Sequence, residues 1–205
     1  MIAALAVATA LLSAPDTLVV GTLADPVSLD PHRATDLAAA AIVSNVCETL
    51  VRWRPDGSRP EPALATTWAT TDGRRWTFTL RSGVRFHDGA PLDADAVIAN
   101  LQAITRARGL AAHAERIGPF VVGITLDQPN AALLATLSQP FFSLVSPRAL
   151  SAERPTAIGT GPFVLASARP GLVELRANPD YWGGAPRLAR VTFQRAPDAA
   201  TLARR

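Results

Sequence analysis

Lysine is absent from this chain of 205 residues, and all 20 basic side chains are arginines. The arginines are scattered along the sequence, and against 17 acidic residues they leave a formal net charge of only +3. A nucleic-acid-binding protein typically carries a basic block or stripe, whereas scattered charges are typical of a solvated surface. The sequence therefore excludes nucleic acid as an expected partner.

Cysteine and histidine are scarce, and their positions argue against a metal site. Cys47 is the only cysteine, so no intramolecular disulfide can form, and its apolar surroundings in the sequence predict a buried position. The three histidines, at positions 32, 87 and 113, show no ligand spacing such as His-x-x-x-His. His87 begins a His-Asp-Gly sequence that is typical of a turn. We therefore expect no metal, no cofactor and no catalytic residues.

Long apolar runs are also missing after the N-terminus, where no run approaches the ~18 residues that a membrane-spanning helix needs. The first 14 residues are almost wholly apolar, and small residues near position 14 suit a signal peptidase. No Lys or Arg precedes this apolar segment. We expect residues 1–14 to be a signal peptide and the mature chain to be periplasmic or otherwise extracytoplasmic.

The composition that remains is that of a folded protein, with 48% apolar and 18% charged residues. In the first half, residues 17–21 predict a buried strand, and apolar spacing predicts a helix from about Asp36 to near Val51. Asp72-Gly73 predicts a hairpin turn between two strands, of which the second buries Trp76. Further predictions are a strand at 84–86, a helix capped by Asp93 with an inner stripe of Val97, Leu101 and Ile104, a strand at 117–126 and a helix at 131–137.

The last third of the chain predicts short strands separated by proline and glycine turns, at 163–165, 173–176 and 191–193. The Gly-Thr-Gly-Pro run at 159–162 lacks the phosphate-loop pattern, and it precedes a predicted strand instead of a helix. We therefore expect it to be a segment that crosses between two parts of the fold. Its glycines would permit strained backbone angles there. Tyr181 and Trp182 follow an Asn-Pro turn. We expect them to pin their loop to the fold, ahead of stacking on a ligand.

Five short motifs occur in a fixed order along the chain. They are Ser28-Leu29-Asp30-Pro31-His32, residues 62–68, residues 76–89, Gly159-Thr160-Gly161-Pro162-Phe163 and residues 178–184. In this order and with these gaps, they resemble the extracytoplasmic solute-binding proteins of the peptide/nickel ABC transporter type, solute-binding protein family 5. The resemblance covers nearly the whole chain from about Val20 onward.

The resemblance implies an α/β fold of mixed α+β content, a periplasmic-binding-protein-like type II lobe with an inserted smaller β-rich domain. Carried over to this sequence, the first lobe comprises residues 15–45 plus 156–205, and the inserted domain comprises residues 46–155. Members of the family continue into a second ligand-binding lobe beyond the point that corresponds to Arg205. The resemblance thus covers an N-terminal portion of a family member.

The function implied by the resemblance is that of a substrate-binding component of an ABC importer, not of an enzyme. Its partners would be a peptide or other small-molecule ligand and a membrane permease, and the protein is expected to be a monomer. In peptide-binding relatives, backbone after the Ser-Leu-Asp-Pro-His motif lines the cleft and can pair with an extended ligand. The corresponding ligand-binding candidates are Ala34, Thr35, Asp36 and Leu37. One of Thr35 and Asp36 is also expected to cap the following helix.

Three alternatives stay open at this point. The cargo could instead be a nickel chelate, a sugar or an opine, since the family scaffold hosts several. The chain could be a truncated, non-functional fragment of such a receptor. A hydrolase that uses paired carboxylates is the weakest alternative, because no spacing in the sequence suggests such a pair.

Overall fold

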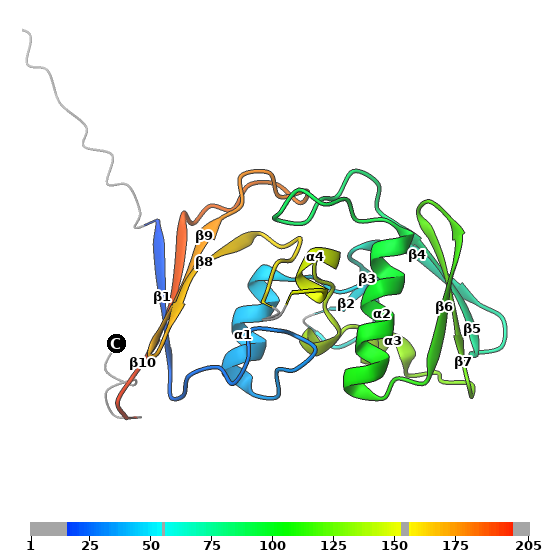
Figure 1. Ribbon diagram of the computed structural model, residues 1–205, viewed down its shortest axis with the longest axis horizontal. Coiled ribbons are helices and arrows are strands. Elements are labelled where there is room, and N and C mark those ends of the chain that lie inside the picture. The colour runs from blue at the N-terminus through cyan, green and yellow to red at the C-terminus, as the bar shows by residue number, and fades with distance from the viewer. Residues whose placement is uncertain (1–15, 55, 153–155, 199–205) are drawn as a thin grey trace, which may run out of the picture.

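The computed structural model describes residues 16–54, 56–152 and 156–198. Two four-stranded sheets stand at opposite ends of the molecule, with helices packed between them (Figure 1). Within these residues, no helix combines the length and the apolar character needed to cross a bilayer. The expected signal peptide, residues 1–14, lies outside the described part of the chain.

The first sheet joins the N-terminal strand to the last third of the chain, in the order β1-β10-β9-β8. These strands are β1 (Thr17–Thr22), β8 (Phe163–Arg169), β9 (Leu172–Ala177) and β10 (Arg190–Arg195). β1 runs parallel to β10, whereas β9 is antiparallel to both β10 and β8. The three strands predicted after residue 155 are confirmed.

Strand β1 is not buried, contrary to the prediction from its run of apolar residues. Leu18 is 47% exposed and Val19 is 54% exposed. β1 is the edge strand of its sheet, so only β10 lies beside it. The short apolar run therefore predicted the strand correctly but did not predict how exposed its side chains are.

The second sheet has the order β4-β5-β7-β6, with all neighbours antiparallel. Its strands are β4 (Ala65–Thr70), β5 (Arg75–Leu80), β6 (Ala112–Gly118) and β7 (Val121–Leu126). The hairpin between β4 and β5 is confirmed, and Gly73 has the positive φ of 65° that favours glycine. The single strand predicted at 117–126 is wrong, because a turn at Pro119 and Phe120 divides this region into β6 and β7.

Trp76 occupies the buried face of β5, where it is only 7% exposed and its ring stacks on Phe78 at 6.3 Å between centroids. We expect Trp76→Ala to lower the free energy of unfolding by ~3 to 5 kcal/mol, as large-to-small changes in cores do. Urea denaturation of both proteins measures this difference. A loss below ~1 kcal/mol would mean that the indole packs on the wet face of the sheet.

Two short strands and several helices lie between the sheets. The strands are β2 (Val51–Trp53) and β3 (Pro60–Pro62), and the helices are α1 (Leu37–Val46), α2 (Ala94–Arg108), α3 (Leu133–Leu137), the 3-10 turn η1 (Pro140–Phe142) and α4 (Pro147–Leu150). No strand forms at 84–86, although Val84 and Phe86 are buried; the neighbouring Arg85 makes one isolated bridge to Pro91.

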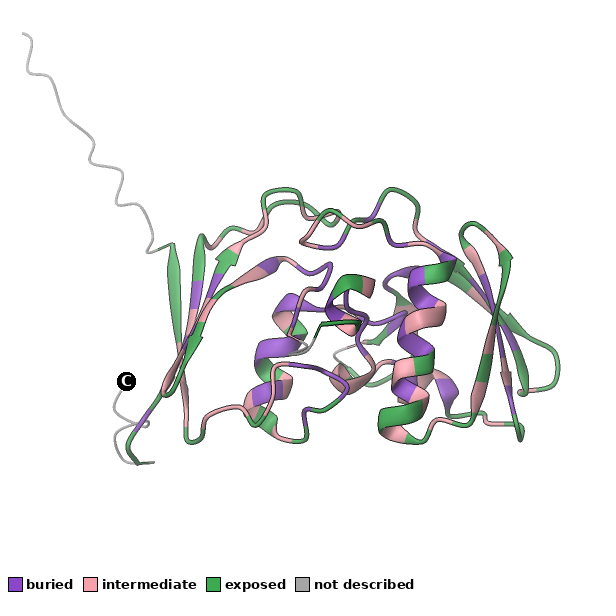
Figure 2. Cartoon of the chain, in the orientation of Figure 1, coloured by how far each residue is buried: buried purple, intermediate pink, exposed green. Residues whose placement is uncertain are grey.

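Helix α2 forms as its sequence predicts. The Asp93 side chain accepts a hydrogen bond from the Ala96 amide at 2.9 Å, and Gly109 ends the helix with a φ of 69°. The predicted stripe of Val97, Leu101 and Ile104 is buried, and Figure 2 shows the buried side of α2 turned toward the interior. This helix therefore covers the inner face of the second sheet.

Helix α1 ends earlier than predicted, at Val46 instead of near Val51. Its C-cap, Cys47, is extended and buried, which confirms the predicted burial of the thiol. Burial raises the pKa of this thiol far above its ordinary value. The helix stops because the crossing segment at Gly159–Gly161 packs on its last turn, and the Gly161 amide donates to the Val46 carbonyl at 3.0 Å. Residues 47–50 then lead into the region of the second sheet.

Candidate functional site

The loop between β1 and α1 forms part of the lower face of the molecule in Figure 1, beside the C-terminal end of α2. Its tight turn is held by Asp30, whose backbone carbonyl accepts from the amides of Arg33 and Ala34 at 3.0 and 2.9 Å. The Asp30 carboxylate also accepts from the His32 amide at 2.9 Å. The Ser-Leu-Asp-Pro-His motif thus folds as a closed turn that presents the residues after it.

His32 anchors this turn to the rest of the fold. It is only 4% exposed, and its Nε2 lies 3.0 Å from the carbonyl oxygen of Ser143, which immediately follows η1. Burial lowers the pKa of His32, with the nearby Arg108 acting in the same direction and the bond to Ser143 and the charge of Asp30 opposing it. The imidazole therefore serves the fold in its neutral form, as a donor through Nε2.

Acidification is expected to destabilise the protein through this histidine. In the unfolded state the pKa of His32 is about 6.5, and in the folded state it is lower. Below about pH 6.5 the unfolded state therefore binds more protons than the folded state, and the free energy of unfolding falls as the pH drops. We expect His32→Asn to reduce the slope of melting temperature against pH between about 7.5 and 5. Thermal melts over this pH range test the effect. The control is His113→Asn, because His113 is exposed. An unchanged slope in His32→Asn would contradict it.

Arg108, in the last turn of α2, ties the helix to the same loop. Its guanidinium donates to the Pro31 carbonyl at 3.0 Å and to the Ala34 carbonyl. It also lies over the Phe141 ring, 4.9 Å from the centroid. This one side chain of α2 therefore fixes the loop of residues 31–34 against both α2 and η1.

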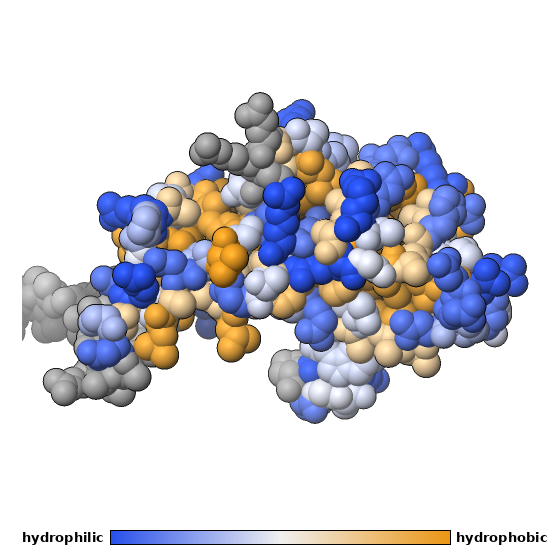
Figure 3. Space-filling model, turned by 60° about the horizontal axis from the view of Figure 1, so that its bottom comes forward, coloured by the Kyte–Doolittle hydropathy of each residue, from blue (hydrophilic) through white to orange (hydrophobic). Residues whose placement is uncertain are grey.

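A hollow of about 510 Å³ opens between this loop, the end of α2 and α4, and we call it the loop–helix hollow. It is lined by Asp30, His32, Arg33, Thr35, Ala103, Arg106, Ala107, Arg108 and Leu150. Figure 3 shows the face that includes the bottom of the molecule, where strongly hydrophilic side chains lie among exposed apolar ones. A hollow of this size suits a small molecule.

The four predicted ligand-binding residues have different environments in the structure. Ala34 is fully buried, and both its amide and its carbonyl are used, by Asp30 and Arg108. Thr35 is exposed and lines the loop–helix hollow. Asp36 caps α1, which confirms the capping prediction, since its carboxylate accepts from the amides of Ala39 at 2.8 Å and Val27 at 3.0 Å. Leu37 is 88% exposed at the start of α1.

Exposed apolar side chains surround this loop. Leu23 is 58% exposed, Val27 is 74% exposed, and the Val27 amide is joined to Asp36 at the start of α1 by the 3.0 Å hydrogen bond. Together with Leu37, they are three exposed apolar residues between positions 23 and 37. None of the three lines the hollow itself, which is lined by three arginines and a few small or apolar side chains.

The sequence did not predict a second polar cluster, which centres on Glu48. Its carboxylate accepts three hydrogen bonds of 2.8 Å each, from the Thr160 hydroxyl, the Tyr181 hydroxyl and the Trp182 indole. The guanidinium of Arg81 covers the Trp182 ring at 4.1 Å. The prediction that Tyr181 and Trp182 pin their loop is confirmed. No local signal could have found Glu48, because its partners are more than 100 residues away in the sequence.

Hydrogen bonds hold the carboxylate of Glu48 through both of its oxygens. Both carboxylate oxygens have donors, and burial raises the pKa of Glu48 although the three donors and the charge of Arg81 oppose that rise. The raised pKa alone would be compatible with acid–base chemistry. These three hydrogen bonds instead indicate a structural task for Glu48, which joins Thr160 of the crossing segment to the loop at 178–184.

The described residues contain no group of three or more His, Cys, Asp or Glu side chains that could hold a metal ion. His87 contacts the Gly161 carbonyl through Nε2 at 3.0 Å, and Asp88 accepts from the Ala90 amide at 3.1 Å. Gly89 has a φ of 82°. The His-Asp-Gly sequence is thus the turn that was predicted.

Comparison with known proteins gives consistent results for sequence and structure. Residues 59–205 match the family described as bacterial extracellular solute-binding proteins, family 5, middle. The nickel-binding periplasmic protein of Escherichia coli is 33% identical over 93% of this chain and 39% of its own length. NikA from Brucella suis with Fe(III)-EDTA superposes with a TM-score of 0.82 at 31% identity, covering 90% of this chain and 40% of NikA.

A peptide-bound structure is also similar. DppA from Helicobacter pylori, in complex with the peptide STSA, has a TM-score of 0.81 at 27% identity and covers 91% of this chain and 44% of DppA. The expected fold, a partial lobe of the type II periplasmic-binding-protein class, is confirmed. The chain spans about two fifths of the length of the proteins that it matches.

Proposed function

Because the chain belongs to the bacterial extracellular solute-binding proteins of family 5, we propose that it is the substrate-binding component of an ABC importer. In this role it binds oligopeptides or similar small solutes outside the cytoplasmic membrane and delivers them to a permease. It is a binding protein without catalytic activity. The observation that carries the proposal is the loop–helix hollow, which lies directly beside the segment from Ala34 to Leu37.

The chemistry of the hollow supports binding of a peptide-like solute. Thr35 is exposed, lines the hollow and makes no hydrogen bond within the part of the chain that the structure describes, so its backbone is open to an extended ligand. Leu37 adds apolar surface next to it. We keep Ala34, Thr35, Asp36 and Leu37 as the ligand-binding segment, with Ala34 and Asp36 holding its shape.

The proposed lobe organisation follows the two sheets. β1 and β8 to β10 form one sheet with its own core, to which α1 contributes Ile42, Val43 and Val46. β4 to β7 form the other sheet, whose core includes Trp76 and Phe78. We propose that residues 15–45 plus 156–205 are the first lobe and that residues 46–155 are inserted into it.

Solution NMR tests the binding proposal, because it detects weak association with a single lobe. Trialanine is titrated into the isotope-labelled protein, and chemical-shift changes are expected at Thr35, Leu37 and Arg106. Shift changes that are absent, or that map only to the outer face of β4 to β7, would overturn the proposal. Fractionation of cells that express the natural gene tests the location, and recovery of the protein in the cytoplasmic fraction would contradict it.

A further inference from the structure

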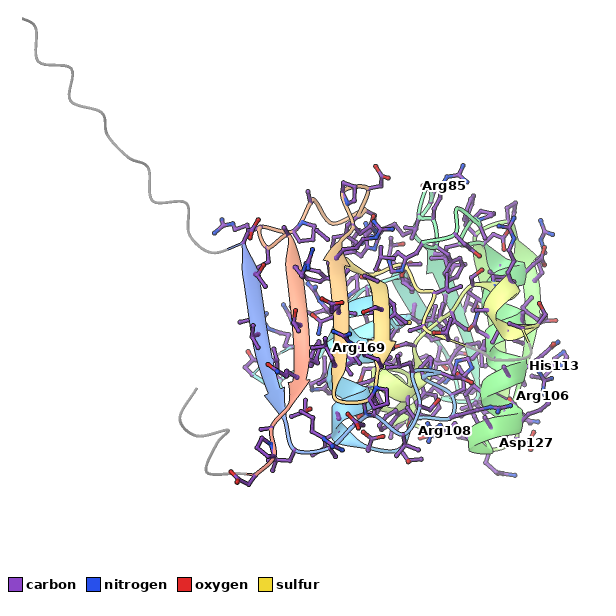
Figure 4. The ribbon with its side chains drawn as sticks, turned by 60° about the vertical axis from the view of Figure 1, so that its left-hand side comes forward. Arg85, Arg106, Arg108, His113, Asp127 and Arg169 are labelled. Atoms are coloured by element: carbon purple, nitrogen blue, oxygen red, sulfur yellow. The ribbon has the colours of Figure 1, made fainter. Side chains whose placement is uncertain are left out.

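A pocket separate from the loop–helix hollow lies between the turn of residues 83–89 and the loop of residues 178–184. Its volume is about 380 Å³, and we call it the turn–loop pocket. Figure 4 shows Arg85, which lines this pocket, at the top of the molecule, whereas Arg106 and Arg108 of the hollow lie near its lower end. The two sites share no lining residue. The turn–loop pocket is lined by Gly83, Arg85, Phe86, His87, Gly89, Asn178, Asp180 and Trp182.

The crossing segment holds both walls of this pocket. The His87 amide donates to the Gly159 carbonyl at 2.8 Å, and Nε2 of His87 lies 3.0 Å from the Gly161 carbonyl oxygen. The Asn178 side chain donates to the same Gly161 oxygen at 3.2 Å, and its Oδ1 accepts from the Asp180 amide at 3.1 Å. Because the turn and the loop share this anchor, the pocket between them is formed before any ligand arrives.

Two opposite charges line the pocket, and the fold pairs neither of them. The Arg85 guanidinium donates to the Gly89 carbonyl at 2.9 Å, but within the described ranges it forms no ion pair. The Asp180 carboxylate has no ion-pair partner there either. Exposed charges often stay unpaired, since water screens them, but these two belong to one pocket. The space between them can therefore take a molecule that carries both charges.

His87 adds no charge to the pocket. Burial lowers the pKa of its imidazole, and the charge of Arg176 acts in the same direction, whereas the bond to Gly161 and the charge of Asp88 oppose them. Because Nε2 donates to a carbonyl, Nδ1 carries a lone pair in the neutral ring, and it is buried without a hydrogen-bond partner among the described residues. A proton on Nδ1 would be a buried donor left unpaired. The lining therefore holds one cation and one anion.

The rest of the lining includes two aromatic side chains, Phe86 and Trp182. Trp182 is fixed in place, because its indole donates to Glu48 at 2.8 Å and the Arg81 guanidinium lies 4.1 Å from its ring centroid. Aromatic rings provide a large apolar contact surface. The pocket thus offers an apolar wall in addition to its two charges.

We propose that the turn–loop pocket binds a free α-amino acid with an apolar side chain. Arg85 meets the carboxylate, because a guanidinium presents N–H donors that match its two oxygens. Asp180 accepts from the ammonium group, and the side chain packs on Phe86 and Trp182. The volume of the pocket suits a molecule of this size. The inference is independent of the proposed function, since the site lies outside the loop–helix hollow.

The test compares three molecules with the same apolar side chain. They are L-leucine, leucinamide, which lacks the carboxylate, and isocaproate, which lacks the ammonium group. NMR titration of the isotope-labelled protein measures the three dissociation constants. We expect L-leucine to shift resonances of Arg85, His87 and Asp180. It should bind roughly fivefold more tightly than either of the other two, the effect of one unit-charge contact at about 4 Å in water.

Two variants assign each charge to its residue. Arg85→Gln should weaken L-leucine binding roughly fivefold but should not weaken leucinamide binding, because leucinamide has no carboxylate to lose. Asp180→Asn should weaken L-leucine binding by a similar factor but should not weaken isocaproate binding. Arg169→Gln is the matched control, because Arg169 is exposed and lies outside the pocket. It should leave all three affinities unchanged.

The comparison of the three molecules in the unmodified protein decides the inference even if a variant does not fold. Equal affinities for all three, or L-leucine binding that neither Arg85→Gln nor Asp180→Asn weakens, would mean that the pocket does not recognise a zwitterion. The site itself is wrong if L-leucine shifts no residue of the turn–loop pocket. Neither result changes the binding of trialanine at the loop–helix hollow, so the proposed function stands or falls separately.

Discussion

Replacement of Gly159 by alanine is expected to destabilise the protein by more than about 3 kcal/mol, because the added methyl group has no space. A Cβ at this position would lie 2.2 Å from the Val46 carbonyl oxygen, 2.5 Å from Cys47 Cα and 2.8 Å from Cys47 Sγ. Two of these contacts are with backbone, which cannot turn aside as a flexible side chain can. The crossing segment and the end of α1 would have to separate.

Thermal and urea denaturation measure this effect, and Gly118→Ala is the matched control. The Cβ of Gly118 would lie no closer than 3.7 Å to its nearest neighbour, Val121, and the residue has no positive φ. Its replacement is therefore expected to change stability by less than about 0.5 kcal/mol, as substitutions away from tight packing do. Similar stabilities for both variants would show that the crossing segment does not pack closely on α1.

The glycines of the crossing segment illustrate what sequence alone could and could not predict. The Gly-Thr-Gly-Pro run correctly indicated a crossing, but strained backbone angles were the wrong reason for its glycines. Neither Gly159 nor Gly161 has a positive φ. Both are needed because backbone from residues 45–47 approaches them closely. Close approach between segments more than 100 residues apart leaves no local pattern.

Predictions of caps, of a tight turn and of a helix's buried stripe depend on neighbouring residues, and these succeeded, whereas the strand predicted at 84–86 did not form. The Asp36 and Asp93 caps, the turn at Gly73 and the inner stripe of α2 are all set within a few residues of the chain. The structure agrees with each of them, because local hydrogen bonding and apolar spacing determine such features largely by themselves.

Predictions that depended on tertiary surroundings were less accurate. β1 was expected to be buried, yet it is an exposed edge strand, and the end of α1 was placed five residues too late. The predicted strand at 117–126 contains Pro119, whose turn the apolar pattern concealed. At the candidate site, the ligand-binding role of residues 34–37 stays a prediction, and the sequence gave no indication of Arg108, which reaches that loop from the C-terminal end of α2.

Replacement of Glu48 by alanine is expected to cost about 3 to 5 kcal/mol, because it removes one acceptor group that serves three donors. The Thr160 hydroxyl, the Tyr181 hydroxyl and the Trp182 indole would each lose a 2.8 Å hydrogen bond. A buried donor left unpaired, here the Thr160 hydroxyl, costs about 1 to 3 kcal/mol, and the half-buried donors of Tyr181 and Trp182 each add a smaller cost. For a domain of this size, the melting temperature should fall by roughly 10 °C. Amide hydrogen exchange is expected to accelerate in residues 178–184, since the loop loses its attachment.

Glu48→Gln is the matched variant, and it is expected to keep most of the stability. The amide oxygen can accept from Trp182 and Thr160, and the amide nitrogen can donate to the Tyr181 oxygen, because a phenol hydroxyl both donates and accepts. A large loss in Glu48→Gln, equal to that in Glu48→Ala, would show that the negative charge is required. That result would contradict the inference that neutral hydrogen bonds are enough for the structural role of Glu48.

The same pair of variants determines how Glu48 makes stability depend on pH. Burial raises the pKa of Glu48, so between the unfolded value of about 4.3 and the higher folded value the folded state binds the proton more tightly. The unfolding free energy contributed by this group therefore decreases as the pH rises through that window. Glu48→Gln cannot ionise and should lack this decrease, so its stability relative to the unmodified protein should increase from about pH 4 upward. If the difference between the two proteins decreases instead, the three donors and Arg81 outweigh burial and hold the carboxylate in its charged form.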